Sequence, residues 1–521
     1  MNVVTGALKQ SSLYQSAIQG GNISYSAYQY DLAMPLPNVY KDFHVKHSVD
    51  GIKNFGDSAS VELSAFGILR DMYIKWEIAY TNGSGGASGS ETAMTPNVAK
   101  HLYARICKRL SLLNSSREVM QIHDDMIQFK TISIEDAGEK AKWLLAGSAN
   151  LQLSKATLQN VGGETQSREV VVAYSATEKT HTFYTKVPFS FFQGRFQSDN
   201  SMKTGLNLRF AEVLRLNIET NPAFHCLAGT GSGADTTATC PIINPRIKKC
   251  EVYCHYDILE TNDNQIVEKQ FSLSTPLSML NGNSVLTESA VSATADETEH
   301  TTKIYNTNLI QNFVVVVHPE RTLAKAQALG NAITLGTSNG TATIGSADGT
   351  APRLTKANIM MDSHQAQHHS VNATVNSVGN TQCSRIGSDY VKLNSCILRS
   401  SGRVLFEADD YKQLLLTTTP QCNWLNVSSG FDREIGQTMD KFGCNDTNFF
   451  IIPFSESGHT NSLTGSLALK GLSTVDITVK FPSKTGNKYV VKVYSNYSQI
   501  TSLDSHSGRQ LINFFPFFVI Y

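Results

Sequence analysis

The chain has 521 residues, of which 41% are hydrophobic and 17% charged, and its 44 basic residues balance its 44 acidic residues. This length exceeds one ordinary domain and predicts two or more. The net charge of zero argues against a chain that coats nucleic acid, because such chains usually carry a basic arm or stripe.

Neither a membrane span nor a secretion signal is expected from the sequence. No stretch approaches the ~18 apolar residues of a membrane-spanning helix, and the first residues lack the basic-then-apolar order of a signal peptide. The nine cysteines are therefore expected to be reduced thiols in a cytosolic setting.

The first part of the chain predicts an arm followed by strands. Residues 1–39 are polar with interspersed tyrosines and end in Pro35-Leu36-Pro37, which predicts an extended arm rather than a domain. Apolar and polar residues then alternate over residues 61–66 and 72–79, as they do in half-buried strands.

Two helices are predicted within this first part. One would start with Thr95 as N-cap and Pro96 at the first helical position, although residues 106–113 could already be strand. A second helix is predicted over residues 134–146, with Gly147 just past its end.

The middle of the chain predicts a boundary and a long loop. Residues 221–245 are rich in Gly, Thr, Ala and Pro and are interpreted as the boundary between two β domains. A strand is predicted over residues 250–256. Residues 330–388 form a polar insertion of a length that is usually functional or mobile in a compact domain.

Three strand-like runs lie near the end of the chain. Residues 449–454 form a continuous apolar run, which is typical of a strand covered on both faces. Residues 475–481 alternate between apolar and polar, as in a half-buried strand, and residues 489–497 repeat that pattern.

The order of these runs resembles a known family. The strand FFIIPFSE, a small-residue loop ending near Ser466, an alternating strand and then VYSNYSQITSLDSHSG are similar to the C-terminal end of the double jelly-roll major capsid proteins. These belong to nucleocytoplasmic large DNA viruses, virophages and polinton-like viruses. Ser498 stands where the family pattern has Asn, and Pro453 and Glu456 are split by two residues, so the match is one of pattern rather than identity.

Further matches follow in the family's order from about residue 40 to 508. They are carried by FGILRDMYIKWEI, VPFSFF, YDILETNDNQIVEKQ, NTNLIQNFVVVVHPERT and SSGRVLFEADDYKQLL. The resemblance implies an all-β fold of two tandem jelly-roll β-sandwich domains with a few short inserted helices and long loops. The corresponding division is an N-terminal arm at 1–39, a first jelly roll at 40–245 and a second jelly roll at 246–521.

The function that the resemblance implies is that of a structural major capsid protein. Homotrimeric, pseudo-hexameric capsomers would tile the icosahedral shell of a double-stranded DNA virus. The expected partners are the chain itself, neighbouring capsomers, penton and minor capsid proteins and an inner membrane, without direct sequence-specific nucleic-acid binding. The expected location is the virion, after synthesis in the host cytoplasm or a viral factory.

One alternative comes from a different class of protein. A secreted or surface β-sandwich protein that binds carbohydrate would show a signal peptide, exposed aromatic clusters or calcium-binding acidic loops, and none of these is evident.

Two groups of residues could ligate a metal, and both have a simpler interpretation. His364, His368 and His369 have a spacing that suits a metal site on a helix, but they lie in a polar loop and are expected to be solvated. Cys250 and Cys254 share one face of a predicted strand and are expected to fill the core.

Two further groups are interpreted in the same way. Gly229, Gly231 and Gly233 lack the Lys-Ser/Thr of a phosphate-binding loop and are interpreted as a flexible loop. A local basic group is interpreted as a solvated helix or strand end; it consists of Lys100, Arg105, Lys108 and Arg109. With no G-x-S-x-G, no H-E-x-x-H and no convincing carboxylate pair, the chain is predicted not to be an enzyme, with no catalytic, cofactor or metal residues and no cofactor.

Overall fold

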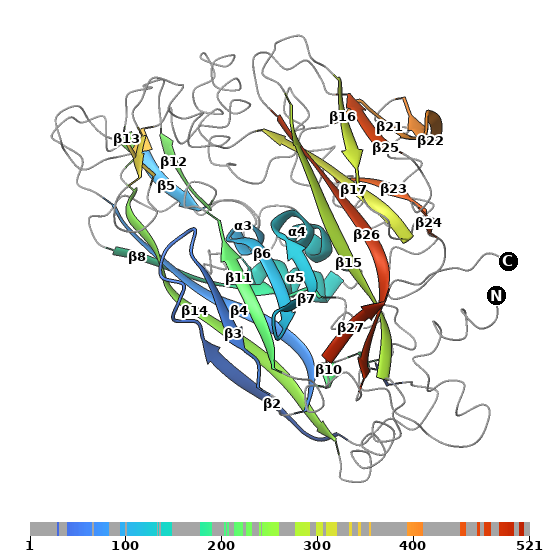
Figure 1. The fold of residues 1–521 in the computed structure, drawn as a ribbon. Coiled ribbons are helices and arrows are strands. Elements are labelled where there is room, and N and C mark those ends of the chain that lie inside the picture. The colour runs from blue at the N-terminus through green and yellow to red at the C-terminus, as the bar shows by residue number, and fades with distance from the viewer. Residues whose placement is uncertain are drawn as a thin grey trace.

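The computed structural model of the chain consists of two groups of β-sheets with helices between them (Figure 1). The residues that the structure describes are 29–30, 39–64, 67–82, 94–98, 102–132, 134, 137–147, 178–189, 203–204, 206–207, 213–221, 226–231, 239–240, 242–259, 277–291, 299–305, 309–319, 333–335, 342–344, 354–355, 393–409, 449–454, 466–468, 474–480, 489–504 and 510–514.

The first group is built from eight main strands. They are β2 (Val39–Ser48), β3 (Ser58–Glu62), β4 (Ile68–Asn82), β6 (Cys107–Asn114), β7 (Arg117–His123), β8 (Glu178–Lys186), β11 (Leu214–Thr220) and β14 (Ile242–Leu259). One sheet has the strand order β2-β14-β4-β8, and the other has the order β3-β11-β6-β7. All of these neighbours pair antiparallel.

The second group has eight main strands as well. They are β15 (Leu277–Ala290), β16 (Glu299–Ile304), β17 (Leu309–Pro319), β21 (Ser395–Ser400), β22 (Arg403–Ala408), β23 (Phe450–Pro453), β25 (Val475–Lys480) and β26 (Tyr489–Asp504). Their sheets have the orders β15-β26-β17-β23 and β16-β25-β21-β22.

The two groups share one topology. If the main strands of each group are numbered in chain order, one sheet joins the first, eighth, third and sixth strands. The other joins the second, seventh, fourth and fifth strands. Two packed antiparallel sheets with this eight-strand arrangement form a jelly roll. The chain is therefore all-β with two tandem jelly rolls, named below the first jelly roll (β2 to β14) and the second jelly roll (β15 to β26).

The position of β14 bears on the boundary between the jelly rolls. The sequence predicts that residues 246–259 belong to the second domain, but β14 contains them and pairs with β2 and β4 of the first. The stretch 221–245, interpreted as loop, also contains the start of β14. We propose that the first jelly roll extends to Leu259 and that the second begins with β15.

Short strands extend or accompany these sheets. They are β1 (Gln29–Tyr30), β5 (Met94–Val98), β9 (Lys203–Thr204), β10 (Leu206–Asn207), β12 (Leu227–Gly231), β13 (Thr239–Cys240), β18 (Ile333–Leu335), β19 (Ala342–Ile344), β20 (Leu354–Thr355), β24 (Leu467–Ala468) and β27 (Gln510–Phe514). The predicted arm and the predicted 330–388 insertion lie mostly outside the described residues.

Three helices are described, and all belong to the first jelly roll. They are α3 (Leu102–Arg105), α4 (Asp124–Ile132) and α5 (Ala137–Ala146). Helix α5 matches the helix predicted over residues 134–146, and α4 was not predicted. Within the described parts of the chain, no helix is long and apolar enough to span a bilayer.

The helix predicted from Thr95 is wrong. Thr95 and Pro96 lie in β5, which pairs antiparallel with β12. The cap-like Thr-Pro sequence is a local signal only, and the strand partner that overrides it lies more than a hundred residues further along the chain. The alternative of strand over residues 106–113 is confirmed by β6.

The core of the second jelly roll lies between its two sheets. Alternate residues of β17, Phe313, Val315 and Val317, belong to one buried apolar cluster with residues of β25 such as Ile477 and Val479. Full burial of each such side chain contributes about 1.5–3 kcal/mol to stability. The strands predicted over residues 449–454, 475–481 and 489–497 are confirmed as β23, β25 and the first half of β26.

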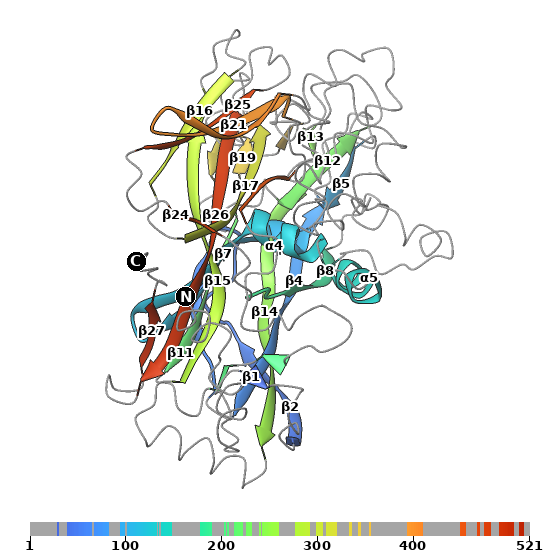
Figure 2. The same ribbon diagram turned by 90° about the vertical axis from the view of Figure 1, so that its right-hand side faces the viewer.

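The sheet β15-β26-β17-β23 is covered on both faces. Val314 and Val316 of β17 are fully buried, yet they point away from the core cluster that holds their neighbours. Helix α4 lies between this sheet and the first jelly roll in both views (Figure 1; Figure 2).

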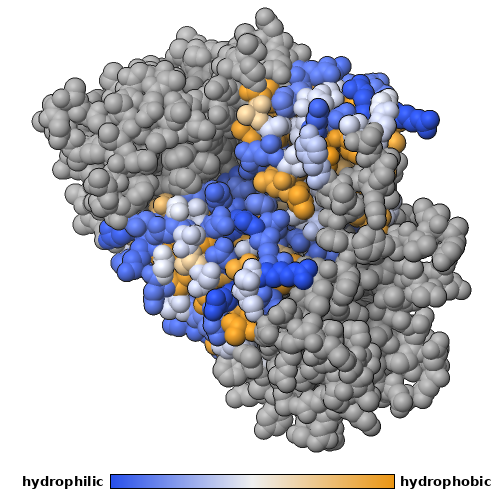
Figure 3. All heavy atoms as spheres, in the orientation of Figure 1, coloured by the Kyte–Doolittle hydropathy of each residue, from blue (hydrophilic) through white to orange (hydrophobic). Residues whose placement is uncertain are grey.

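The described surface in the view of Figure 3 mixes hydrophilic and hydrophobic residues.

Candidate functional site

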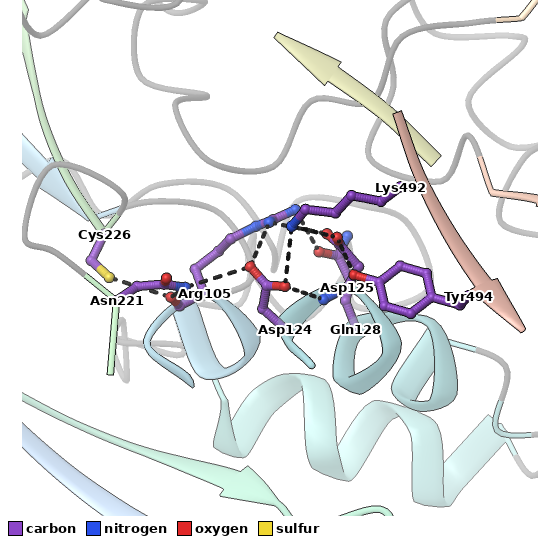
Figure 4. Close-up of polar contacts among 8 residues, drawn as sticks. All are labelled: Arg105, Asp124, Asp125, Gln128, Asn221, Cys226, Lys492 and Tyr494. Atoms are coloured by element: carbon purple, nitrogen blue, oxygen red, sulfur yellow. Dashed lines mark hydrogen bonds and ion pairs between the residues drawn. The ribbon is translucent and has the colours of Figure 1, made fainter. Parts of the chain in front are cut away.

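A cluster of buried polar side chains joins the two jelly rolls. It is formed by Arg105 at the end of α3, by the first turn of α4 and by β26 of the second jelly roll (Figure 4). Arg105 is only 2% exposed and Asp125 is fully buried. Buried charges are costly unless they are paired and hydrogen-bonded, so the contacts of this cluster determine whether the junction is stable.

Arg105 supplies the hydrogen bonds from the side of the first jelly roll. Its Nη1 lies 3.5 Å from Asp124 Oδ2 and 3.2 Å from Asp125 Oδ1. Its Nη2 donates to Gln128 Oε1 at 3.3 Å. The backbone carbonyl of Arg105 in turn accepts a hydrogen bond from Asn221 Nδ2 at 2.7 Å. The arginine is thus held at both its backbone and its guanidinium.

The second jelly roll contributes one cation and one hydroxyl. Lys492 Nζ lies 3.2 Å from Asp125 Oδ2 and 3.7 Å from Asp124 Oδ1. Tyr494, two residues along on the same face of β26, donates its hydroxyl to Asp125 Oδ2 at 2.7 Å. Asp125 therefore binds groups of both jelly rolls at once.

The cluster is balanced in charge, because two cations face two carboxylates. Burial by itself would lower the pKa of Lys492, but the nearby carboxylates of Asp124, Asp125 and Glu288 hold this pKa above its ordinary value. The two aspartates also lie in the first turn of α4, where the helix dipole favours negative charge. The helix dipole and the two cations therefore act on the carboxylates in the same direction.

Contacts next to the cluster extend the junction along β7. Gln121 donates from its backbone N–H to Asn283 Oδ1 and from its side chain to the Ser284 carbonyl, both at 3.3 Å. Gln499 Nε2 donates to the Val119 carbonyl at 3.1 Å. These contacts join β7, an edge strand of the first jelly roll, to β15 and β26.

Apolar and aromatic contacts complete the junction. The ring of Phe129 on α4 meets that of Phe449, just before β23, edge to face at 5.3 Å between centroids. The ring of His123 lies 6.1 Å from that of Tyr494. Burial lowers the pKa of His123, so its imidazole is neutral at pH 7. The junction thus combines a charged centre with an apolar and aromatic border.

Comparisons with known proteins bear on the fold. A scan against protein-family models finds no match, and a search of the curated proteins finds none either. A quasi-atomic model of the PBCV-1 virus capsid is similar at a TM-score of 0.56 and 10% sequence identity, covering 93% of this chain and 98% of that chain. The crystal structure of PBCV-1 VP54, fitted into a cryo-EM reconstruction of the virophage Sputnik, gives a TM-score of 0.55 at 10% identity with the same coverage, 93% and 98%.

The chain has a double jelly-roll fold. The likeness to the PBCV-1 structures covers nearly the whole chain, so it includes both jelly rolls and not one of them alone. At 10% identity the likeness establishes the fold, and the role of the chain is argued separately below.

The structure corrects the interpretation of the local basic group as a solvated helix or strand end. Arg105, interpreted as part of a solvated basic group, is buried in the junction, and Arg109 pairs with Glu118 and with Glu219, the latter at 3.6 Å. The sequence pattern missed this because the partners of Arg105 lie 19 and 20 residues along the chain, and Lys492 lies 367 residues beyond Asp125.

The structure describes some of the cysteine, glycine and histidine candidates and not others. Cys250 and Cys254 are buried on the inner face of β14, as predicted for core residues, and burial raises the pKa of the Cys254 thiol to about 12. The interpretation of Gly229 and Gly231 as a flexible loop is wrong, because both lie in strand β12, which pairs with β5. Lys108 is exposed, as expected for a solvated residue. The remaining candidates fall outside the described residues; they are Lys100, Gly233, His364, His368 and His369.

Asp125→Asn is expected to lower the free energy of unfolding by about 3–5 kcal/mol. It leaves the buried cations Arg105 and Lys492 with only the more distant carboxylate of Asp124, at 3.5 and 3.7 Å. Urea unfolding measures this. The matched control is Glu62→Gln, which breaks the exposed ion pair with Arg215 and should cost less than about 1 kcal/mol. Equal stability of Asp125→Asn and wild type would contradict the assignment of the junction.

Lys130 on α4 predicts a pH dependence. Its Nζ donates to the Pro188 carbonyl at 3.2 Å, and burial lowers its pKa from 10.5 to about 8. Between about pH 8 and pH 10.5 the Lys130 side chain is protonated in the unfolded chain but not in the folded chain. The free energy of unfolding therefore rises with pH in this range.

Lys130→Met removes this dependence. At pH 7 the variant gains on the order of 1–3 kcal/mol from the lost charge burial, less the lost hydrogen bond. We expect its stability relative to wild type to shrink as the pH rises from about 8 to about 10, as measured by denaturant unfolding at each pH. If the difference in free energy of unfolding between variant and wild type stayed constant or grew with pH, the buried charge of Lys130 would not destabilise the folded chain.

Proposed function

We propose that the chain is a structural capsid protein and that its active form is a homotrimer. The observation that carries this proposal is the repetition of one jelly-roll topology within a single chain, with the two copies held together by a buried junction. The similarity in fold to the PBCV-1 capsid structures supports it.

The physical reasoning starts from symmetry. A chain with two similar units side by side can close around a three-fold axis, and three such chains then present six similar units around that axis. A six-sided building block can tile a shell. A junction that fixes the two jelly rolls relative to each other is needed for this, because units that rotated freely would not give a block of constant outline.

The proposed role is structural rather than catalytic. The charges of the junction cluster are buried and pair with one another between the two jelly rolls. The net charge of zero suits a shell that does not bind the genome directly.

The proposal extends to the setting in which the chain works. The capsomers would form an icosahedral shell of a double-stranded DNA virus, so the protein would be located in the virion. Contacts with penton proteins, minor capsid proteins and an inner membrane, and synthesis in the host cytoplasm or a viral factory, remain predictions of the family resemblance.

Light scattering and negative-stain microscopy of the purified chain test this proposal. We expect a mass three times that of the 57.0 kDa chain and particles with a hexagonal outline. The Glu62→Gln variant should behave in the same way, since it changes only an exposed ion pair. A monomer across a wide range of concentrations would overturn the proposal.

A further inference from the structure

The eighth strands of the two jelly rolls, β14 and β26, contain the same five-residue sequence pattern. The pattern V-Y-x-x-Y begins at Val252 in β14 and at Val493 in β26. In both strands the valine and the second tyrosine are buried inside their own jelly roll, so the first tyrosines, Tyr253 and Tyr494, point outward. The two strands therefore correspond residue by residue, and Tyr253 is the counterpart of the junction residue Tyr494.

The hairpins that contain the fifth strands also correspond. Each has a tight turn with a left-handed serine, Ser115 with φ 54° and Ser401 with φ 49°. Each has an irregularity in the same place after the turn, where one residue is skipped in the pairing. The skipped residues are Val119 in β7 and Leu405 in β22.

These corresponding residues have opposite environments. Val119 is 1% exposed, and its carbonyl accepts the hydrogen bond from Gln499 of the second jelly roll. Leu405 is 42% exposed and its neighbour Val404 is 48% exposed. Among the described strands β22 pairs with β21 alone. An apolar edge strand of this kind is a ready surface for another chain.

We propose that the β22 hairpin of one copy of the chain packs against the outer face of β2 and β14 in a second copy, repeating between copies the junction that β7 makes with β15 and β26 within one chain. This inference rests on the proposed homotrimer and names the two surfaces that form it. Since each chain offers one hairpin and one receiving face, the contact is head-to-tail and can close into a ring.

The receiving face has the chemistry of an uncompleted junction. Glu251, the counterpart of Lys492, has a side chain only 3% exposed and lies among Lys46, Lys75 and Lys249, with Nζ to carboxylate distances of 3.3, 3.8 and 3.1 Å. Tyr253 donates its hydroxyl to Glu251 at 3.2 Å. Three cations around one carboxylate leave this face with a positive surplus.

The end of β22 carries the matching charge. Glu407 and Asp409 are both exposed. Asp409 directly follows β22, just as Asp124, the first residue of α4, directly follows β7. Within the chain, the acidic residues after β7 bind Lys492. Between copies, the acidic residues at the end of β22 meet the lysines around Glu251. In both contacts, acidic residues near the end of the fifth strand thus face lysines of the receiving sheet.

A cross-link follows from the residue correspondence. Gln121 contacts Ser284 within the chain. The counterpart of Gln121 is Glu407, from the pairing after the bulge, and the counterpart of Ser284 is His44, from the pairing with the eighth strand. Glu407 of one copy is therefore expected to lie next to His44 of the next, and both are exposed in the single chain.

The test is a chain with Glu407→Cys and His44→Cys, oxidised mildly and separated on a non-reducing denaturing gel. We expect linked dimers and trimers that return to monomer on reduction. A mixture of the two single variants should give dimers that join one variant to the other. The control double variant, Glu62→Cys with His44→Cys, has an equally exposed first position and should give no such ladder.

Leu405→Asp supplies a second, independent measurement. It should weaken association by at least about tenfold, as loss of a central apolar contact does, whereas Val213→Asp, at an exposed position outside the hairpin, should leave it unchanged. A chain that is a monomer by light scattering contradicts the homotrimer. A trimer that neither cross-links at these positions nor responds to Leu405→Asp keeps the homotrimer and overturns this interface.

Discussion

The double-jelly-roll structure depends on one sheet, β15-β26-β17-β23, being buried on both of its faces. Its inner face packs into the core of its own jelly roll. Its outer face presents Val314 and Val316, which are fully buried, together with Lys492 and Tyr494. The Lys492 ammonium and the Tyr494 hydroxyl need hydrogen-bonding partners once water is excluded. Helix α4 supplies these partners. The position of the first jelly roll relative to the second follows from that requirement.

The charged cluster at this junction determines orientation more than it adds stability. Buried ion pairs gain little net free energy over apolar contacts, but an unpaired member is very costly. Asp125 accepts from Arg105, Lys492 and Tyr494 at once, so only one arrangement of the jelly rolls satisfies all of them. We interpret the cluster as a specificity device, while Phe129, Phe449 and the buried valines supply most of the favourable burial.

The sequence was informative where a strand carries its own pattern. β25 alternates apolar and polar residues, β23 is continuously apolar, and both were predicted. It was misleading at Thr95 and Pro96, where a good local helix start is overridden by pairing with β12. It could not identify the junction, because the meaning of Arg105 depends on a lysine near the end of the chain. The shared V-Y-x-x-Y pattern became meaningful only after the strand pairings showed that β14 and β26 are equivalent.

The central claim is that the two jelly rolls form one cooperative unit through this junction. Native-state hydrogen exchange of backbone amides in β14 and β26, followed by mass spectrometry in low concentrations of urea, tests it most directly. The account predicts that both strands open with the same free energy and the same dependence on urea, because β26 loses the cover of its outer face when the first jelly roll unfolds. A second jelly roll that exchanges at a clearly different free energy, independently of β14, would contradict it.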